Sequence, residues 1–459
     1  MARTVQRSNV PCYLIGNWLV GARVDTDRGS YTGDTMATRQ RRYRERVWVV
    51  ARRLVRPADR QRAEGELTID AQPTPATVRL TARAEVAGDG VRALSVVLRD
   101  LPRGEVLGPL WRAVPLGEGE LALPYPQELH TPLIFVRLPG DAFLYFRAAQ
   151  RGVWQKRFWA AAQRERLTIE LEHPLPTPTS SAQTPEWHFG VTAQPERVVA
   201  EHCAQLERAL GLRPWEKRDD VPQWAREIAL VDVLRAGAAA DSRRVPLDAL
   251  RSVVERLGAR RVLVLVEGQG EETVGTLCRK VQEAGCPAML TVDAESLGRP
   301  TADGAGWARE LGDAAARVAR RFRPQALLIR GVRFADAADH DALLAALAEA
   351  KGRLRQEFPE LLLACHGWRD VLGAIFPLLA ARPPERWPAV FSRYCRCFDL
   401  RAEEATARQE AASATGDRGP EVTRACLPAL LLPTADAASA QGRVERALAR
   451  AEEYARRFL

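Results

Sequence analysis

In the first part of the chain, up to about residue 190, apolar and polar residues alternate along short segments. This period of two is typical of β-strands that turn one face to a core. Segment 131–149 reads as two strands joined by the turn sequence PGD. Many short strands separated by turn residues predict an antiparallel β-sandwich. The other alternating segments are 46–56, 76–86, 91–101 and 166–175.

Between this region and the rest of the chain the pattern changes. The segment PLPTPTSSAQTP (174–185) is rich in Pro, Ser and Thr and is interpreted as a loop or linker. The residues that follow it, EWHFGVTAQP, predict one last strand. Apolar residues then recur at helical spacing in 195–211, and 213–224 is interpreted as a second connector.

From residue 225 onward, short apolar runs alternate with amphipathic helical segments. Strands that are apolar throughout are buried on both faces, as parallel strands are. The predicted strands are 228–234, 260–268, 287–293, 324–331, 360–367, 388–395 and 427–433. The predicted helices are 246–258, 272–285, 306–322, 339–358, 371–381 and 439–459.

About seven βα units of this length favour a (β/α)8 barrel, and an open doubly wound sheet is the alternative. Neither GxGxxG nor GxxxxGK[ST] follows a predicted strand, and EGQGEETVG (267–275) has the glycines in the wrong register. An eighth strand is not evident, so the barrel is expected to be incomplete. The predicted domains are a β-sandwich over 1–190, a helical linker over 191–224 and a (β/α)8-like barrel over 225–459.

Polar and aromatic residues stand where the predicted barrel strands end, and carboxyl ends of barrel strands share one mouth. Each has a plain structural reading as well, such as capping the next helix. Together they predict a polar pocket. The candidates are Glu267 and Asp293 as catalytic residues and Glu295, Arg330, His366, Trp368 and Arg393 as substrate-binding residues.

Glycoside cleavage requires two carboxyl groups on either side of the bond, roughly 5–10 Å apart. Glu267 and Asp293 end neighbouring strands, which lie about 5 Å apart in a sheet, so this spacing is attainable. Trp368 could offer an apolar face on which a sugar ring stacks. We find no motif that predicts a cofactor or a metal site.

Three phrases, at 221–234, 250–268 and 358–372, and the order of the two domains resemble glycoside-hydrolase-like proteins. In such proteins a galactose-mutarotase-type sandwich precedes a (β/α)8 barrel. The resemblance implies an aspartate at the end of the fourth barrel strand and a glutamate on the fifth. Here Arg330 and His366 stand at these positions. Arginine can be neither acid nor nucleophile at neutral pH, so the family chemistry is expected to be lost or changed.

The 459 residues carry a net charge of +9, and the only dense basic run is RQRRYRER (39–46). Because acids are interleaved with the arginines elsewhere, nucleic-acid binding is disfavoured. The eight cysteines have no CxxC spacing and are interpreted as buried thiols. No apolar run approaches the roughly 18 residues of a transmembrane helix, and the protein is expected in the cytoplasm rather than at a membrane.

Three hypotheses remain. The chain is an active carbohydrate enzyme that uses Glu267, Asp293 and Glu295. Alternatively, it is a non-catalytic barrel that binds an acidic saccharide, another small polar ligand or a protein partner through Arg330 and His366. The third, nucleic-acid binding, is the least favoured. The sequence indicates neither the sugar nor the oligomeric state.

Overall fold

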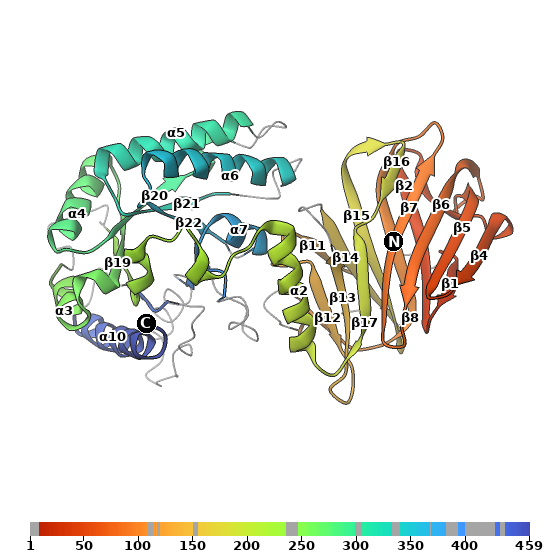
Figure 1. Cartoon of the computed structure of the whole chain (residues 1–459), viewed down its shortest axis with the longest axis horizontal. Helices are drawn as coiled ribbons and strands as arrows, with labels where there is room; N and C mark the ends of the chain where they lie inside the picture. The colour runs from red at the N-terminus through yellow and green to blue at the C-terminus, as the bar shows by residue number, and fades with distance from the viewer. Residues whose placement is uncertain are drawn as a thin grey trace. The chain divides into compact units, whose positions relative to one another are not determined.

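The computed structural model of the chain (Figure 1) divides it into two compact units, each described here by itself. The first unit comprises Met1–Leu210 with Ala338–Asp341, and the second comprises Gly211–Ala337 with Ala342–Leu459. The structure describes residues 9–108, 113–114, 116, 120–149, 155–235, 247–298, 305–332, 340–367, 369–381, 393–399, 427–431 and 437–459.

The first unit is an antiparallel β structure with one long helix, α2 (Pro195–Leu210). The strands are β1 (Cys12–Ile15), β2 (Trp18–Thr26), β3 (Gly29–Gly33), β4 (Thr38–Tyr43), β5 (Arg46–Val55), β6 (Arg62–Pro73), β7 (Thr77–Val86), β8 (Val91–Pro102), β9 (Glu105–Leu107), β10 (Ala113–Val114), β11 (Glu120–Tyr125), β12 (Leu133–Arg137), β13 (Phe143–Ala149), β14 (Lys156–Gln163), β15 (Arg166–Thr179), β16 (Ser181–Gln183) and β17 (Glu186–Thr192).

These strands form two layers. One layer runs β1–β2–β8–β15–β14–β11, and the other runs β4–β5–β6–β7–β17–β13–β12–β9–β10. Aromatic rings meet between the layers: the ring centroids of Trp18 and Phe189 are 4.9 Å apart, and those of Phe158 and Trp187 are 5.6 Å apart. The predicted sandwich is therefore confirmed.

The Pro-rich segment 174–185 is not the predicted linker. Its first half continues β15 to Thr179, and its second half contains β16, which pairs with β7. The reason lies in the pairing of β15. The ladder to β14 begins at Glu172, so Pro174 and the residues after it have β8 on one side only. Proline is tolerated at such an edge because it has no N–H to donate.

A buried histidine of α2 makes the first unit sensitive to acid. His202 is fully buried, and its Nε2 lies 2.7 Å from Thr131 Oγ1. Burial lowers the pKa of His202 to about 3, because the charged imidazolium would lose its hydration. A depressed histidine pKa means that the unfolded state takes up the proton first as the pH falls below its ordinary value.

We therefore expect His202 to cost the first unit about 2 kcal/mol of unfolding free energy between about pH 6.5 and about pH 5. His202→Gln keeps a polar group beside Thr131 but cannot titrate, so it should remove that part of the pH dependence. Urea unfolding followed by hydrogen exchange of α2 and β13 peptides measures it. His366→Gln, at an exposed site in the second unit, is the control. An unchanged slope in His202→Gln would contradict the expectation.

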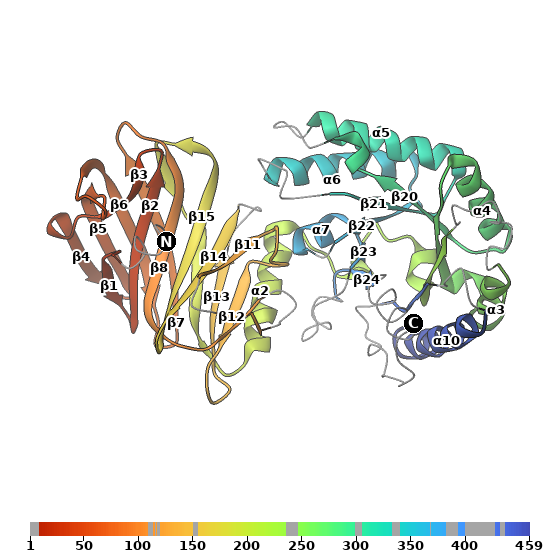
Figure 2. The same ribbon diagram turned by 180° about the vertical axis from the view of Figure 1, so that it is seen from behind.

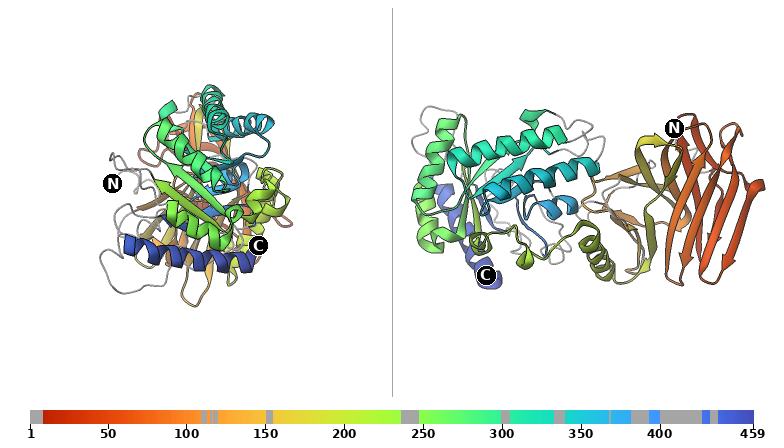
Figure 3. Two further views of the ribbon diagram at one scale, coloured as in Figure 1. Left: turned by 90° about the vertical axis from the view of Figure 1, so that its left-hand side faces the viewer. Right: turned by 45° about the horizontal axis from the view of Figure 1, so that its top comes forward.

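The second unit is built of eight parallel strands with helices outside them (Figures 2 and 3). The strands are β18 (Leu230–Arg235), β19 (Val262–Glu267), β20 (Ala288–Asp293), β21 (Ala326–Arg330), β22 (Leu362–His366), β23 (Leu378–Ala380), β24 (Arg396–Phe398) and β25 (Ala429–Leu431). The helices are α3 (Leu247–Leu257), α4 (Glu271–Glu283), α5 (Ala305–Phe322), α6 (His340–Glu357), α7 (Asp370–Ile375) and α10 (Ala437–Phe458).

The strands follow one another around a nearly closed ring. Each pairs with the next from β18 to β24, and β25 pairs with β18. Between β24 and β25 the described residues show a hydrogen bond of 2.7 Å from Leu427 N to Cys397 O and no ladder. The sheet is therefore the predicted barrel and not the open alternative.

The eighth strand, which is not evident in the sequence, is β23. The segment 371–381 was predicted as one helix. Instead α7 ends at Ile375, and β23 begins at Leu378. Pro377 separates the two elements, and the residue before a proline is disfavoured in a helix. The strand predicted at 388–395 lies in part outside the described residues, and β24 begins only at Arg396.

Alternate residues of the eight strands fill the ring. A single apolar cluster joins side chains of opposite strands, among them Val233, Leu265, Met289, Leu328 and Ala364. Side chains of strands on opposite sides of a barrel can meet only in its interior, so this parity marks the inward-facing positions.

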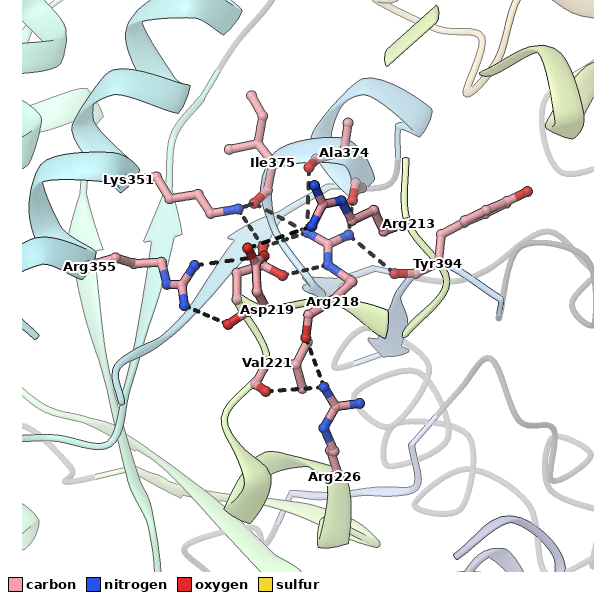
Figure 4. Close-up of polar contacts among 12 residues, drawn as sticks. Arg213, Arg218, Asp219, Val221, Arg226, Lys351, Arg355, Ala374, Ile375 and Tyr394 are labelled. Carbon is pink, nitrogen blue, oxygen red and sulfur yellow. Dashed lines mark hydrogen bonds and ion pairs between the residues drawn. The ribbon is translucent and has the colours of Figure 1, made fainter. Parts of the chain in front are cut away.

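A buried ionic cluster joins the segment before β18 to α6 and to the end of α7 (Figure 4). The guanidinium of Arg218 binds both oxygens of Asp220, at 2.8 and 2.7 Å, and also donates to the carbonyl of Gly373 at 2.6 Å. Lys351 donates to Asp220 and to the carbonyl of Ile375. These carbonyls lie at the carboxyl end of α7, where backbone oxygens need partners and cations are favourable.

Candidate mouth of the barrel

Five strands end in a polar side chain on the inner face. Each of these residues comes two positions after an inward-facing one, so the alternation carries it toward the carboxyl-terminal mouth. They are Arg235 on β18, Glu267 on β19, Asp293 on β20, Arg330 on β21 and His366 on β22. Four of the five are residues that the sequence predicts, and Arg235 was not among the substrate-binding candidates.

Glu267 is the centre of this group. Arg235 Nε donates to its Oε2 at 2.6 Å, and Arg330 Nη2 donates to its Oε1. Strand β20 lies between β19, which carries Glu267, and β21, which carries Arg330. The side chains of Glu267 and Arg330 therefore meet across β20, on the inner face of the ring. The Glu267 side chain is 15% exposed, whereas those of Arg235 and Arg330 are 41% and 34% exposed.

Asp293 and Glu295 lie beside Arg330 but are exposed to water. Asp293 Oδ1 accepts a hydrogen bond of 3.0 Å from the Glu295 amide, and Ala294 N donates to Arg330 O at 2.9 Å. Gly331 has a φ of +79°, and a Cβ there would lie 2.4 Å from Glu295 Cγ. The loops after β20 and β21 therefore pack closely, which brings Asp293, Glu295 and Arg330 together.

The other three candidates have different outcomes. His366 is exposed at the end of β22. Trp368 lies outside the described residues. Arg393 was predicted on a strand near the mouth, but it belongs to a turn that precedes β24, and its carbonyl accepts from Trp215 N at 2.6 Å. Because β24 is parallel to its neighbour, Arg393 lies at the amino end of the ring, opposite the mouth.

The described edge of the mouth carries two neighbouring carboxylates, Glu267 and Asp293, between Arg235 and Arg330. Both oxygens of Glu267 already accept from guanidinium groups, so a substrate hydroxyl would share this carboxylate with two arginines. Asp293 has one oxygen engaged in its own turn. Within the described strand ends, the carboxylate of Glu267 is therefore engaged by two arginines, whereas Asp293 is exposed to water.

No protein-family model and no curated protein matches the chain. Solved structures do. An α-N-acetylgalactosaminidase from Bifidobacterium bifidum, as a quadruple mutant, gives a TM-score of 0.64 at 10% identity over 96% of this chain and 88% of that one. The same enzyme in its GalNAc complex gives 0.63 at 10% identity over 96% and 88%.

A GH36 α-galactosidase from Geobacillus stearothermophilus gives a TM-score of 0.47 at 11% identity over 95% of this chain and 75% of that one. In the described part of this chain, no helix combines the length and apolar character needed to cross a membrane. At 10% identity, the likeness to the N-acetylgalactosaminidase shows a shared fold and nothing more. The chain therefore has the glycoside-hydrolase-like two-domain fold that its sequence resembles, with an antiparallel sandwich followed by a nearly closed eight-stranded parallel barrel.

Proposed function

We propose that this chain binds a neutral saccharide at the mouth of the barrel and does not hydrolyse it. The observation that carries the proposal is the double ion pair of Glu267 with Arg235 and Arg330. It engages the more buried of the two strand-end carboxylates in a donor–acceptor frame. Sugar hydroxyls both donate and accept hydrogen bonds, so such a frame suits them.

The charge balance of the mouth argues for a neutral ligand over the acidic saccharide of the second hypothesis. Two arginines, Arg235 and Arg330, face three carboxylates, Glu267, Asp293 and Glu295, on the described strand ends and the loop after β20. A uronate would have to overcome the excess of carboxylates. A hexose or an acetamido-hexose brings no charge of its own.

The absence of hydrolysis follows from the roles that the described residues can take. Arg330 ends the fourth barrel strand and can supply neither a proton nor a nucleophilic oxygen at neutral pH. His366 ends the fifth, and an imidazole can serve as a base but cannot stabilise an oxocarbenium ion as a carboxylate does. Glu267 meets two guanidinium groups instead of an open subsite.

GalNAc and galactose are the first ligands to test, because a glycosidase that shares the fold binds GalNAc. We expect saturable binding of one of them by calorimetry, without release of nitrophenol from the corresponding α-glycosides. Arg330→Ala removes a hydrogen-bond donor and one of the two ion pairs that hold Glu267, so it should weaken saccharide binding about tenfold or more. Glu360→Gln, at an exposed position before the amino end of β22, should bind like the unmodified chain.

Two outcomes would overturn parts of this proposal. Turnover by the unmodified chain that disappears in Glu267→Gln would restore the active-enzyme hypothesis. Glucuronate bound about tenfold more tightly than galactose would restore the acidic-saccharide alternative.

A further inference from the structure

One edge of the sandwich in the first unit is open to a further strand. Strand β4 pairs with β5 along its whole length, and β3 pairs with the far end of β5. Among the described residues, no ladder joins the other side of β4. Every residue from Arg39 to Tyr43 is exposed. The backbone N–H and C=O groups that alternate residues of β4 turn away from β5 are therefore open to a partner.

The side chains along this edge are cationic. The segment 39–46 contains five arginines and one acid, Glu45. Arg39 and Arg41 share the outer face of the layer with Trp48, whereas Arg42 lies on the opposite face. Among the described residues, no carboxylate forms an ion pair with any of these three arginines. Their charge is therefore available to an acidic partner.

The acids on the outer face of the layer lie too far from the edge to cancel this charge. Glu66 and Asp70 lie on β6, beyond β5, and Asp70 pairs with Arg46 at 3.1 Å. Neighbouring strands lie about 4.8 Å apart, so a strand added beside β4 would lie about 14 Å from β6. Exposed charges are largely screened beyond about 8 Å at physiological ionic strength. An added strand therefore meets the arginines of β4 rather than the acids of β6.

Exposed apolar side chains lie at both ends of the edge. Met36, in the turn before β4, is 87% exposed, and Tyr43, the last residue of β4, is 63% exposed. Leu14 of β1 is exposed as well, and its carbonyl accepts a hydrogen bond of 3.0 Å from Gln40 Nε2. Single exposed apolar residues are common on protein surfaces, but a group of them beside an open strand edge indicates an interaction surface.

We propose that β4 is the docking edge for an extended acidic segment of another protein, which adds to the sheet as one more strand. Backbone hydrogen bonds to β4 hold the segment, and its alternate carboxylates pair with Arg39 and Arg41 on the outer face. Apolar residues at its two ends cover Met36 and Tyr43. This edge is independent of the saccharide proposal, because it uses residues of the first unit alone.

A second copy of this chain is a poorer occupant of the edge. Full-length antiparallel pairing of β4 with another β4 would place Arg39 opposite Arg42 and Gln40 opposite Arg41. Like charges directly opposite each other destabilise a strand pair. Charged side chains on an edge strand protect it against such self-pairing, and an acidic strand turns the same charges into an attraction.

The test is fluorescence anisotropy of a labelled peptide of alternating Glu and Thr, about ten residues long, titrated with the full chain. We expect a dissociation constant on the order of 100 μM at low salt, which rises with added salt. The matching Lys–Thr peptide should not bind. Hydrogen exchange of segment 38–43 should slow when the Glu–Thr peptide is added, because amides on the open edge become hydrogen-bonded.

A second peptide separates strand pairing from plain charge attraction and needs no variant of the chain. Replacing alternate threonines of the Glu–Thr peptide by proline keeps its charge but removes backbone N–H donors. This peptide should bind about tenfold more weakly or worse.

Two double variants test the arginines. Arg39→Gln combined with Arg41→Gln should weaken the Glu–Thr peptide about tenfold or more. The control is Arg79→Gln combined with Arg83→Gln, which removes the same charge from exposed positions of β7. Strand β7 has neighbours on both sides and offers no open edge, so the control should bind like the unmodified chain.

The proposal fails if the unmodified chain does not bind the Glu–Thr peptide, or if the proline-containing peptide binds equally well. It also fails if the β7 control weakens binding as much as the β4 variant does. A labelled oligothymidylate of about the same charge that bound about tenfold more tightly than the peptide would assign the edge to nucleic acid instead.

Discussion

Asp220→Ala should destabilise the second unit by about 3–5 kcal/mol, the usual cost of removing one partner from a buried ionic group. Asp220 is 5% exposed and faces both Arg218 and Lys351. Burial by itself would raise the pKa of the Asp220 carboxyl, but hydrogen bonds and charge from Arg218 and Lys351 outweigh burial and keep it below its ordinary value. The alanine variant leaves two buried cations facing each other.

Hydrogen exchange of peptides from β21 and β22 measures the unfolding free energy of the second unit. Peptides from β7 and β8 serve as the reference for the first unit. The adjacent Asp219 supplies the matched control. Its side chain is 75% exposed and lies 3.7 Å from Arg213 and 3.9 Å from Arg355. Asp219→Ala should therefore change the unfolding free energy by less than about 0.5 kcal/mol. A loss below about 1 kcal/mol in Asp220→Ala would mean that the cluster does not stabilise the second unit.

Asp232→Asn should remove a pH dependence worth about 4 kcal/mol from the second unit. Asp232 is fully buried on the outward-facing parity of β18. Its Oδ1 accepts from Val233 N at 2.8 Å, and its Oδ2 has no hydrogen-bond partner among the described residues. Burial raises the pKa of Asp232 to about 7.

The sign follows from proton uptake. Between the ordinary carboxyl value and about 7, the folded state keeps a proton that the unfolded state has lost. Stability should therefore fall as the pH rises through this interval and change no further above it. Asn resembles the protonated carboxyl, so its profile should be flat by comparison. Urea unfolding at about pH 5 and about pH 8 tests this, with the exposed Asp313→Asn as control. Parallel profiles for Asp232→Asn and the unmodified chain would sink the idea.

Much of the barrel can be predicted because its strands are buried on both faces. The runs that end at Glu267, Asp293 and Arg330 are apolar and bounded by helices, and they form the predicted strands. A strand as short as β23 gives no such signal, and its apolar residues fit a helix equally well. Only Pro377 marks the break.

The candidate mouth could be located from the sequence because alternation along a strand continues to its last residue. This reasoning finds Glu267 and His366. It cannot find the pairing of Glu267 with Arg235 and Arg330, which depends on side-chain reach across the ring. It misplaces Arg393, because the strand was expected at 388–395 and β24 begins only at Arg396. The contact of Asp220 with Lys351 joins residues 131 positions apart, so no local sequence pattern predicts it.

The join between β24 and β25 has a mechanical consequence. Seven of the eight neighbouring strand pairs are held by ladders, and at this join the described residues show the bond from Leu427 to Cys397. Bending energy stored in a rolled sheet is released most easily where its two margins touch. Transient opening of the ring should therefore start at this margin.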